Sequence, residues 1–193
     1  MPVDAAALKL VTFPAPVLRQ RAQPVPEVND EVRAVAQKML EIMEQAEGIG
    51  LAAPQVGLSW RLFVVDVPPR EPDEPDDDDA LDADALHNDA DNGSHAAQPT
   101  APHAAGDPDP EPPEHTDGPV VYINPVLFDA RGAVVPYEEG CLSLPKIRGD
   151  VLRPPVISIR ATGLDGREFT HTAGGLLARC WQHEMDHLDG VLI

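Results

Sequence analysis

Near the end of the sequence, two histidines and a glutamate stand in a spacing that suits metal chemistry. The run is His183-Glu184-Met185-Asp186-His187. Residues four apart lie on one face of a helix, so both imidazoles can bind a single metal ion. Glu184 lies beside them, where its carboxylate can accept a proton from a water molecule that the metal activates. The pattern therefore predicts a catalytic metal site, although a surface helix with two histidines would show it too.

A catalytic metal site usually has three protein ligands and one open position, so a third ligand has to be found. In one protease pattern a histidine stands six residues after the second ligand, where this sequence has Ile193. We therefore expect the third ligand upstream, among Cys141, Cys180, His171 or a carboxylate. Cys141 has the more suggestive surroundings, the run Glu-Gly-Cys-Leu-Ser at 139–143. Cys180 is a real rival because it stands one helical turn before the first histidine.

A third segment, at 48–57, is rich in small residues. It reads Gly-Ile-Gly-Leu-Ala-Ala-Pro-Gln-Val-Gly and has one polar side chain, Gln55. Small residues let the backbone approach a ligand or another part of the chain closely. The segment matches no phosphate-binding loop, since it has no Gly-Lys-Ser/Thr run. It predicts either a ligand-binding backbone or a tight connection between a helix and a strand.

The acidic charge of the chain is concentrated in one segment. Of 193 residues, 33 are acidic and 14 are Lys or Arg, a net charge of −19. Residues 68–118 hold 16 acids against one base, which is −15 of that charge, together with 10 of the 22 prolines. With so few large apolar side chains, this segment cannot offset its ordering entropy. We expect one domain over 1–193, interrupted by a disordered insertion at 68–118.

The remaining charge and composition exclude several classes of protein. An acidic chain is not drawn to nucleic acid or to an anionic membrane by simple electrostatics. Two cysteines do not make a disulfide scaffold, and no apolar run approaches the ~20 residues that span a bilayer. The first residues show no signal peptide. We therefore expect a cytoplasmic protein that binds neither nucleic acid nor membranes.

The positions of apolar residues indicate helices and strands in an α+β arrangement. A stripe at helical spacing predicts a helix from Asn29 or Asp30 to about Glu47, with Gly48 as its C-cap. Alternating and β-branched runs predict strands, of which the last two form a hairpin. A final helix carries the two histidines. The strands are expected at 61–67, 120–124, 156–161 and 168–172, and the final helix at 175–189.

Taken together, the three segments resemble the peptide deformylase family. That family shows G-Φ-G-Φ-A-A-x-Q, E-G-C-Φ-S and H-E-x-D-H in this order, where Φ is apolar, and the sequence matches all three without a mismatch. The resemblance covers about 1–67 and 119–193. It implies an α+β fold with small antiparallel or mixed sheets around a central H-E-x-D-H helix and with an N-terminal helix. It also implies hydrolysis of the formyl group from N-formylmethionine at the start of newly synthesised polypeptides.

The resemblance further implies a role for each matching residue. Cys141, His183 and His187 would bind the metal, usually Fe²⁺, with Zn²⁺, Ni²⁺ or Co²⁺ able to substitute. Glu184 would carry the proton, while the Gln55 amide and the Leu142 backbone N–H would stabilise the oxyanion. The substrate-binding residues implied in this way are Gly48, Ile49, Gly50, Tyr137, Gly140, Leu176 and Cys180.

Two departures from the family pattern limit what is carried over. Arg179 stands where the family commonly has an apolar residue at the rim of the methionine pocket. Many bacterial members continue past the position of Ile193 into a helix that docks on the ribosome in some of them, so ribosome docking is not implied here. N-formylmethionyl nascent peptides remain the expected partners. A zinc peptidase and a non-catalytic metal-binding regulatory domain are the alternatives.

Overall fold

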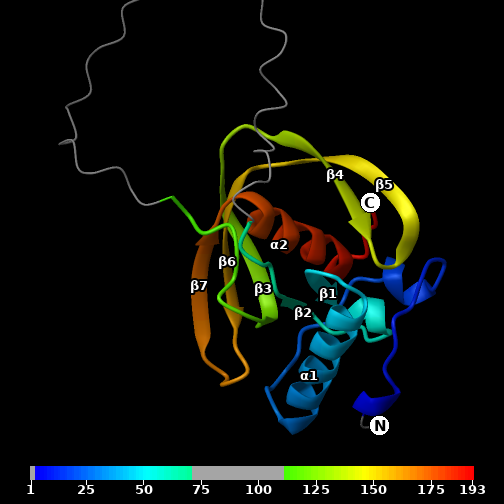
Figure 1. The fold of residues 1–193 in the computed structure, drawn as a ribbon. Helices are drawn as coiled ribbons and strands as arrows, with labels where there is room; N and C mark the ends of the chain where they lie inside the picture. Colours follow the sequence, from blue (N-terminus) through cyan, green and yellow to red (C-terminus); the bar gives the residue numbers. More distant parts are fainter. Residues whose placement is uncertain (1–2, 71–110) are drawn as a thin grey trace, which may run out of the picture. The chain divides into compact units, whose positions relative to one another are not determined.

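The computed structural model describes residues 3–70 and 111–193, which apart from Arg70 form one compact unit. Residues 71–110, the larger part of the insertion predicted at 68–118, lie outside the described residues. The described ranges contain two α-helices and seven strands, with three short 3-10 helices at Ala5–Ala7, Pro16–Arg19 and Ala53–Val56 (Figure 1). The helices are α1 (Asp30–Gln45) and α2 (Gly175–Leu188). The strands are β1 (Gly50–Ala52), β2 (Leu62–Val65), β3 (Val120–Arg131), β4 (Val135–Cys141), β5 (Leu144–Arg153), β6 (Val156–Thr162) and β7 (Glu168–Ala173).

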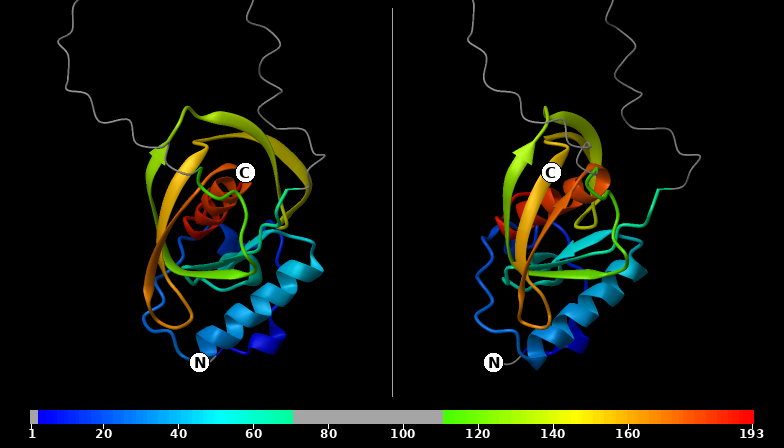
Figure 2. Two further views of the ribbon diagram at one scale, coloured as in Figure 1. Left: turned by 60° about the vertical axis from the view of Figure 1, so that its left-hand side comes forward. Right: turned by 90° about the vertical axis from the view of Figure 1, so that its left-hand side faces the viewer.

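Five strands form an antiparallel sheet in the order β1-β2-β3-β6-β7, and the two helices pack on opposite sides of its β1–β2 end (Figures 1 and 2). The apolar run in β2 explains why both faces are covered. Phe63 and Val65 point to the core that contains α2, whereas Leu62 and Val64 point to the core that contains α1. Because side chains alternate across a strand, four consecutive apolar residues need a partner on each face.

Helix α1 begins where the sequence predicts it. The Asn29 side chain accepts a hydrogen bond from the Val32 N–H at 3.0 Å, a typical N-cap. The far end differs from the prediction. The helix ends at Gln45, Glu47 takes the left-handed conformation at φ 54°, and Gly48 donates to the Met43 carbonyl at 2.9 Å. Gly48 is therefore not the residue that turns the chain.

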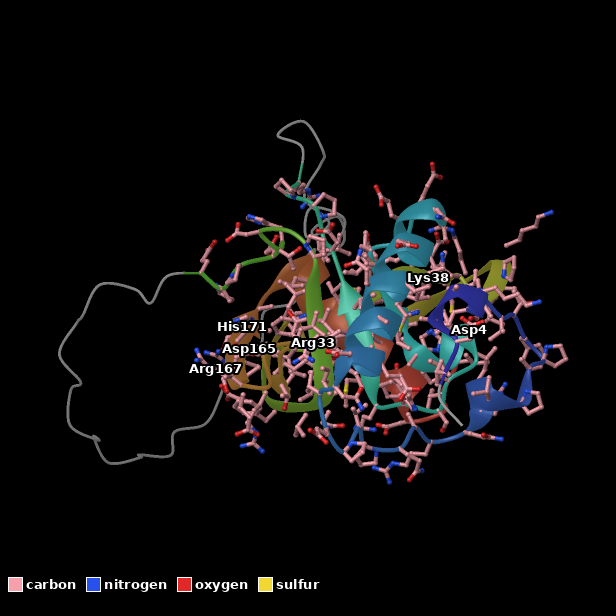
Figure 3. The ribbon with its side chains drawn as sticks, turned by 90° about the horizontal axis from the view of Figure 1, so that it is seen from below. Asp4, Arg33, Lys38, Asp165, Arg167 and His171 are labelled. Atoms are coloured by element: carbon pink, nitrogen blue, oxygen red, sulfur yellow. The ribbon has the colours of Figure 1, made fainter. Side chains whose placement is uncertain are left out.

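At the β6–β7 turn, the fold is tied to α1. The Arg33 Nε donates to the Leu164 carbonyl at 3.2 Å. Figure 3 shows Arg33 of α1 beside this hairpin, with Asp165 and Arg167 at its turn. This contact links the β6–β7 hairpin to α1.

Strands β4 and β5 form a separate two-stranded antiparallel sheet that arches over α2 (Figure 1). The apolar pattern of the sequence does not mark the bounds of either strand. Both are largely exposed and carry few consecutive apolar residues, so their pattern does not stand out. Helix α2 lies between this small sheet and the β1–β2 end of the large one, which brings the three predicted motifs together. None of the helices in the described part of the chain is long and apolar enough to cross a membrane.

The end of the predicted insertion, residues 111–118, packs against the folded unit. Thr116 exchanges hydrogen bonds with Val67, from Thr116 N to the Val67 carbonyl at 2.9 Å and from Val67 N to Thr116 Oγ1 at 3.0 Å. The carbonyls of Pro113 and Glu114 accept from Gly174 at 3.0 Å and Leu177 at 3.1 Å, at the start of α2. These bonds satisfy backbone donors that a helix leaves free at its N-terminus, where Gly174 has no capping side chain.

Candidate metal centre and active site

Three side chains from two elements converge beneath the arch of β4 and β5. Cys141 ends β4, and His183 and His187 lie on adjacent turns of α2. Their ligand atoms all lie within 4.8 Å of one another, and the Cys141 Sγ is 3.2 Å from the His187 Nε2. A register shift between Gly140 and Cys141 ends the regular β4–β5 pairing at this point. The cysteine thus approaches from a different direction than the two histidines.

A buried carboxylate orients the first histidine. Glu139 Oε2 lies 2.9 Å from His183 Nδ1, and Glu139 also accepts from Arg153 at 2.6 and 2.9 Å and from Arg179 at 3.1 Å. Burial opposes ionisation of Glu139, but these hydrogen bonds and the charge of Arg153 lower its pKa to about 2. An ionised Glu139 keeps a proton on His183 Nδ1, which leaves Nε2 for a metal.

The two histidines have opposite electrostatic environments. Burial disfavours a proton on His183, yet hydrogen bonds to Cys141 and Glu139 and the charge of Glu184 raise its pKa to about 10. For His187, burial and then the nearby positive charges of His183 and Arg153 lower the pKa to about 3. Without a metal, His187 is therefore neutral at pH 7, whereas His183 has to release the proton on Nε2 to bind one.

Glu184 is buried beside this cluster with one oxygen unsatisfied. It is 3 % exposed, and its Oε2 has no hydrogen-bond partner among the described residues. Burial raises its pKa to about 7, although the charges of His183 and Arg153 oppose the shift. A carboxylate with a pKa near the working pH can both accept and release a proton.

Gly50 makes room for that carboxylate. A Cβ built at residue 50 would lie 2.8 Å from Cys180 Sγ and 3.0 Å from the Glu184 carboxyl carbon, and closer still to Glu184 Oε1. Any side chain here would have to displace Glu184. The glycines at 48 and 50 therefore serve close packing against the site, and Gly50–Ala52 is itself a strand.

The side chain of Gln55 points toward the cluster in a fixed orientation. It is 1 % exposed, its Oε1 accepts from the Ala52 N–H at 2.8 Å, and its Nε2 lies 3.6 Å from Cys141 Sγ. Because Ala52 engages the oxygen, the amide presents its N–H groups to the site. Leu142 follows Cys141 in the turn between β4 and β5, and Ser143 Oγ anchors this turn to the Val11 carbonyl at 2.9 Å.

A cavity of about 620 Å³ opens beside the cluster. It is bordered by the backbone at Gly48–Gly50 on one side and by β4 and the start of β5 on the other. All seven residues predicted to bind substrate line it: Gly48, Ile49, Gly50, Tyr137, Gly140, Leu176 and Cys180. Glu184, Gln55, Cys141, Leu142 and His183 line it as well. The cavity is large enough for a short peptide segment with one long side chain.

The two other residues named as candidates for a third ligand are not part of the donor cluster. His171, labelled in Figure 3, is exposed on β7 opposite Ile159 of β6, and its ring packs on Phe169 at 4.7 Å. Cys180 is buried and its Sγ lies 3.7 Å from the Ile49 carbonyl. Burial, followed by the charges of Glu184 and Glu139, raises the pKa of the Cys180 thiol well above its ordinary value. Cys180 therefore packs as a neutral thiol.

Three buried polar residues support the site but are not predicted as functional from the sequence: Glu139, Arg153 and Arg179. Glu139 was noted only as part of a motif, although its position two residues before Cys141 places both on one face of a strand. Arg153 bridges Glu139 and Asp186, the latter at 2.9 Å. Arg179 was noted only as a departure from the family pattern. No sequence signal marks Arg153 or Arg179 as buried, since arginines are mostly exposed.

The residues present fit a bound divalent metal. One sulfur and two imidazole nitrogens form a donor set that suits zinc or iron. The buried Glu184 Oε2, which lacks a partner in the described ranges, lies beside that set and lines the cavity. An uncompensated buried carboxylate is costly, so a water molecule or ion at this point would stabilise it. The arrangement is that of a metallohydrolase site.

Comparison with known proteins identifies the family. The sequence profile described as Polypeptide deformylase matches residues 7–193. The peptide deformylase of Acidobacterium capsulatum is 39% identical, over 95% of this chain and 82% of that protein. Peptide deformylase 2 of Gloeobacter violaceus is 40% identical, over 91% of this chain and 71% of that protein.

Solved structures give the same result. Peptide deformylase from Ehrlichia chaffeensis is 30% identical with a TM-score of 0.72, covering 96% of this chain and 84% of that one. The enzyme from Synechococcus elongatus, solved in complex with actinonin, is 34% identical with a TM-score of 0.68, covering 100% and 79%. The chain belongs to the polypeptide deformylase family. It is a metal-dependent hydrolase that removes the N-formyl group from N-formylmethionine of newly synthesised polypeptides, which decides against the peptidase and regulatory alternatives.

Proposed function

We propose that Cys141, His183 and His187 hold one metal ion, Fe²⁺ in the native protein, and that Glu184, Gln55 and Leu142 carry out the chemistry beside it. The observation that carries this proposal is the set of three donor atoms within 4.8 Å beside the buried Glu184. The donor set suits iron or zinc. The choice of iron rests on the resemblance to the family, whose usual ion it is.

Each reacting group of the substrate has a counterpart in the site. The ion supplies Lewis acidity, which makes water a better nucleophile near neutral pH. Glu184 accepts the proton of the attacking water and delivers it to the leaving amine, a role worth about 10²–10⁴ in rate. The Gln55 amide, held by Ala52, and the Leu142 N–H donate to the oxyanion that develops on the formyl oxygen. One such donor is typically worth about 2.7–4 kcal/mol.

The cavity accounts for recognition of the rest of the substrate. We propose that the methionine side chain enters between Ile49, Leu176 and Tyr137, which line the cavity together. The peptide backbone would then pair in β fashion with residues around Ile49 and Gly140, at the edges of β1 and β4. The partners are N-formylmethionyl nascent peptides, and the protein would act in the cytoplasm, where such peptides are made.

Turnover of formyl-Met-Ala-Ser tests this proposal directly. Protein purified without oxygen should release formate from that peptide, and it should contain about one iron per chain by elemental analysis. An exposed-surface variant such as Arg167→Met provides a matched preparation for comparison. Absence of formate release from metal-loaded protein would refute the proposed roles, and turnover with zinc but not iron would refute only the choice of metal.

A further inference from the structure

Helix α2 and strand β4 make three consecutive side-chain contacts at matching intervals. Every second residue of the strand meets every fourth residue of the helix. Two strand residues advance about 6.8 Å and four helix residues about 6.0 Å, so successive contacts stay nearly aligned. The contacting pairs are Cys141 with His187, Glu139 with His183 and Tyr137 with Arg179. The first two pairs belong to the metal centre, and the third extends the same series into the cavity.

The third pair is fixed by an arginine whose polar contacts are all internal. The Arg179 side chain is buried, with 8 % of the residue exposed. Its guanidinium carbon lies 4.8 Å from the centre of the Tyr137 ring. One terminal nitrogen donates to Glu139 Oε1 and to the Val151 carbonyl, each at 3.1 Å, and the other donates to the Val135 carbonyl at 3.3 Å. Arg179 thus fastens α2 to both strands of the small sheet.

These contacts hold one wall of the methionine pocket in place. Arg179 and Tyr137 both line the cavity, next to Leu176 and Cys180 of α2. Tyr137 lies on a two-stranded sheet that is exposed on its outer side, and its ring packs against the Arg179 guanidinium. The planar guanidinium covers one face of the ring while its donors stay bound to acceptors on β4 and β5. A lysine could not do the same, because its ammonium is a point donor and does not stack.

We propose that Arg179 is a positioning residue that acts through Tyr137 to set the shape of the methionine pocket. The inference rests on the proposed function, in which that pocket receives the side chain of formylmethionine. With Arg179 in place, the Tyr137 ring keeps a fixed position and the pocket takes a long unbranched side chain. Without it, the ring and β4 are free to move outward, and a branched side chain such as leucine fits better relative to methionine.

The test compares two formylated peptides across a small set of variants. Steady-state kcat and KM are measured for formyl-Met-Ala-Ser and formyl-Leu-Ala-Ser with the wild-type chain, Arg179→Met and Arg179→Lys, together with metal content. For Arg179→Met we expect KM for the methionine peptide to rise about tenfold, with kcat within about threefold. The ratio of kcat/KM for the methionine peptide to that for the leucine peptide should fall by a similar factor. A difference of one methylene in an apolar pocket commonly changes kcat/KM by about this much. Metal content should not change, because Arg153 still binds Glu139.

A double-mutant cycle with Tyr137→Leu shows whether Arg179 acts through the ring. If it does, Arg179→Met changes the preference little once Tyr137 is leucine, since coupled residues are non-additive. The matched control is Arg167→Met, the same substitution at an exposed arginine (Figure 3). If Arg179→Met does not fold, Arg179→Lys is measured in its place, because it keeps the charge and most of the aliphatic stem.

Two results would overturn the inference. One is an unchanged methionine preference in the folded Arg179 variants, even with lower stability, which would make the residue merely structural. The other is a fully additive cycle with Tyr137→Leu. Failure of the wild-type chain to deformylate either peptide would instead refute the proposed function, so the two failures are distinguishable.

Discussion

A single methyl group at position 50 should disable catalysis while leaving the ligands in place. In Gly50→Ala the new Cβ would lie 2.8 Å from Cys180 Sγ and 3.0 Å from the Glu184 carboxyl carbon, where ordinary contacts lie at about 3.5–4.0 Å. Glu184 and Cys180 are 3 % and 5 % exposed and pack directly beside this position, so the contact is relieved only if one of them moves. The clash therefore displaces the Glu184 carboxylate by roughly 0.5–1 Å, and a misplacement of that size costs about 10²-fold in rate.

The same clash has a measurable effect on stability. Extra volume in a close-packed core typically costs about 1–3 kcal/mol, and each kcal/mol lowers Tm by about 2–4 °C in a chain of this size. We expect kcat for formyl-Met-Ala-Ser to fall about 10²-fold, Tm to fall by several degrees and metal content to stay unchanged.

Gly149→Ala is the matched control. Residue 149 is a strand residue with nothing within 4 Å of a built Cβ and no positive φ, so this variant should behave as the wild-type chain does. If Gly50→Ala kept kcat within about threefold, Glu184 would not be held in place by close packing, and the reasoning would fail.

Three further perturbations separate the roles of the remaining groups. Glu184→Gln should keep its metal and lose about 10²–10⁴-fold in kcat, since an amide cannot accept the proton; a loss below about tenfold would contradict its role as general base. Cys141→Ser should lose metal by elemental analysis, whereas Cys180→Ser should keep it and lose only about 1–3 kcal/mol of stability from an unpaired hydroxyl; the reverse pattern would make Cys180 the ligand. Replacing residues 71–110 by a short Gly/Ser linker should leave kcat/KM nearly unchanged, because the three motifs and the bonds made by 111–118 lie elsewhere and loop length costs little free energy; an unfolded product would count against this.

The two helices and the hairpin of the large sheet could be predicted because their patterns are local. The stripe of α1, the Asn29 cap and the alternation at 156–161 each depend on neighbouring residues only. The strand expected at 61–67 is confirmed in its centre as Leu62–Val65, and that expected at 120–124 extends to Arg131. Strand ends depend on pairing with distant segments, for which the sequence offers no local signal.

Composition alone could not give the boundary of the acidic insertion. Residues 111–118 share the charge and proline content of the segment before them. Even so, Pro113, Glu114 and Thr116 bind the start of α2 and Val67, just after β2, mainly through backbone atoms. A backbone carbonyl accepts a hydrogen bond whatever side chain it carries, so these contacts leave no trace in residue types. A deletion designed from composition would have removed them.

The two histidines could be predicted as metal ligands from the sequence, whereas the role of the residue that supports them could not. Two histidines four residues apart indicate a metal site from the sequence alone, because helix geometry places them on one face. Glu139, by contrast, gains its role from Arg153, Arg179 and His183, which stand 14 to 44 positions later in the chain. Its carboxylate is held ionised only once the small sheet has folded over α2. The sequence therefore indicates which residues can bind a metal or react. The hydrogen bonds formed in the fold then determine which of their atoms remain available.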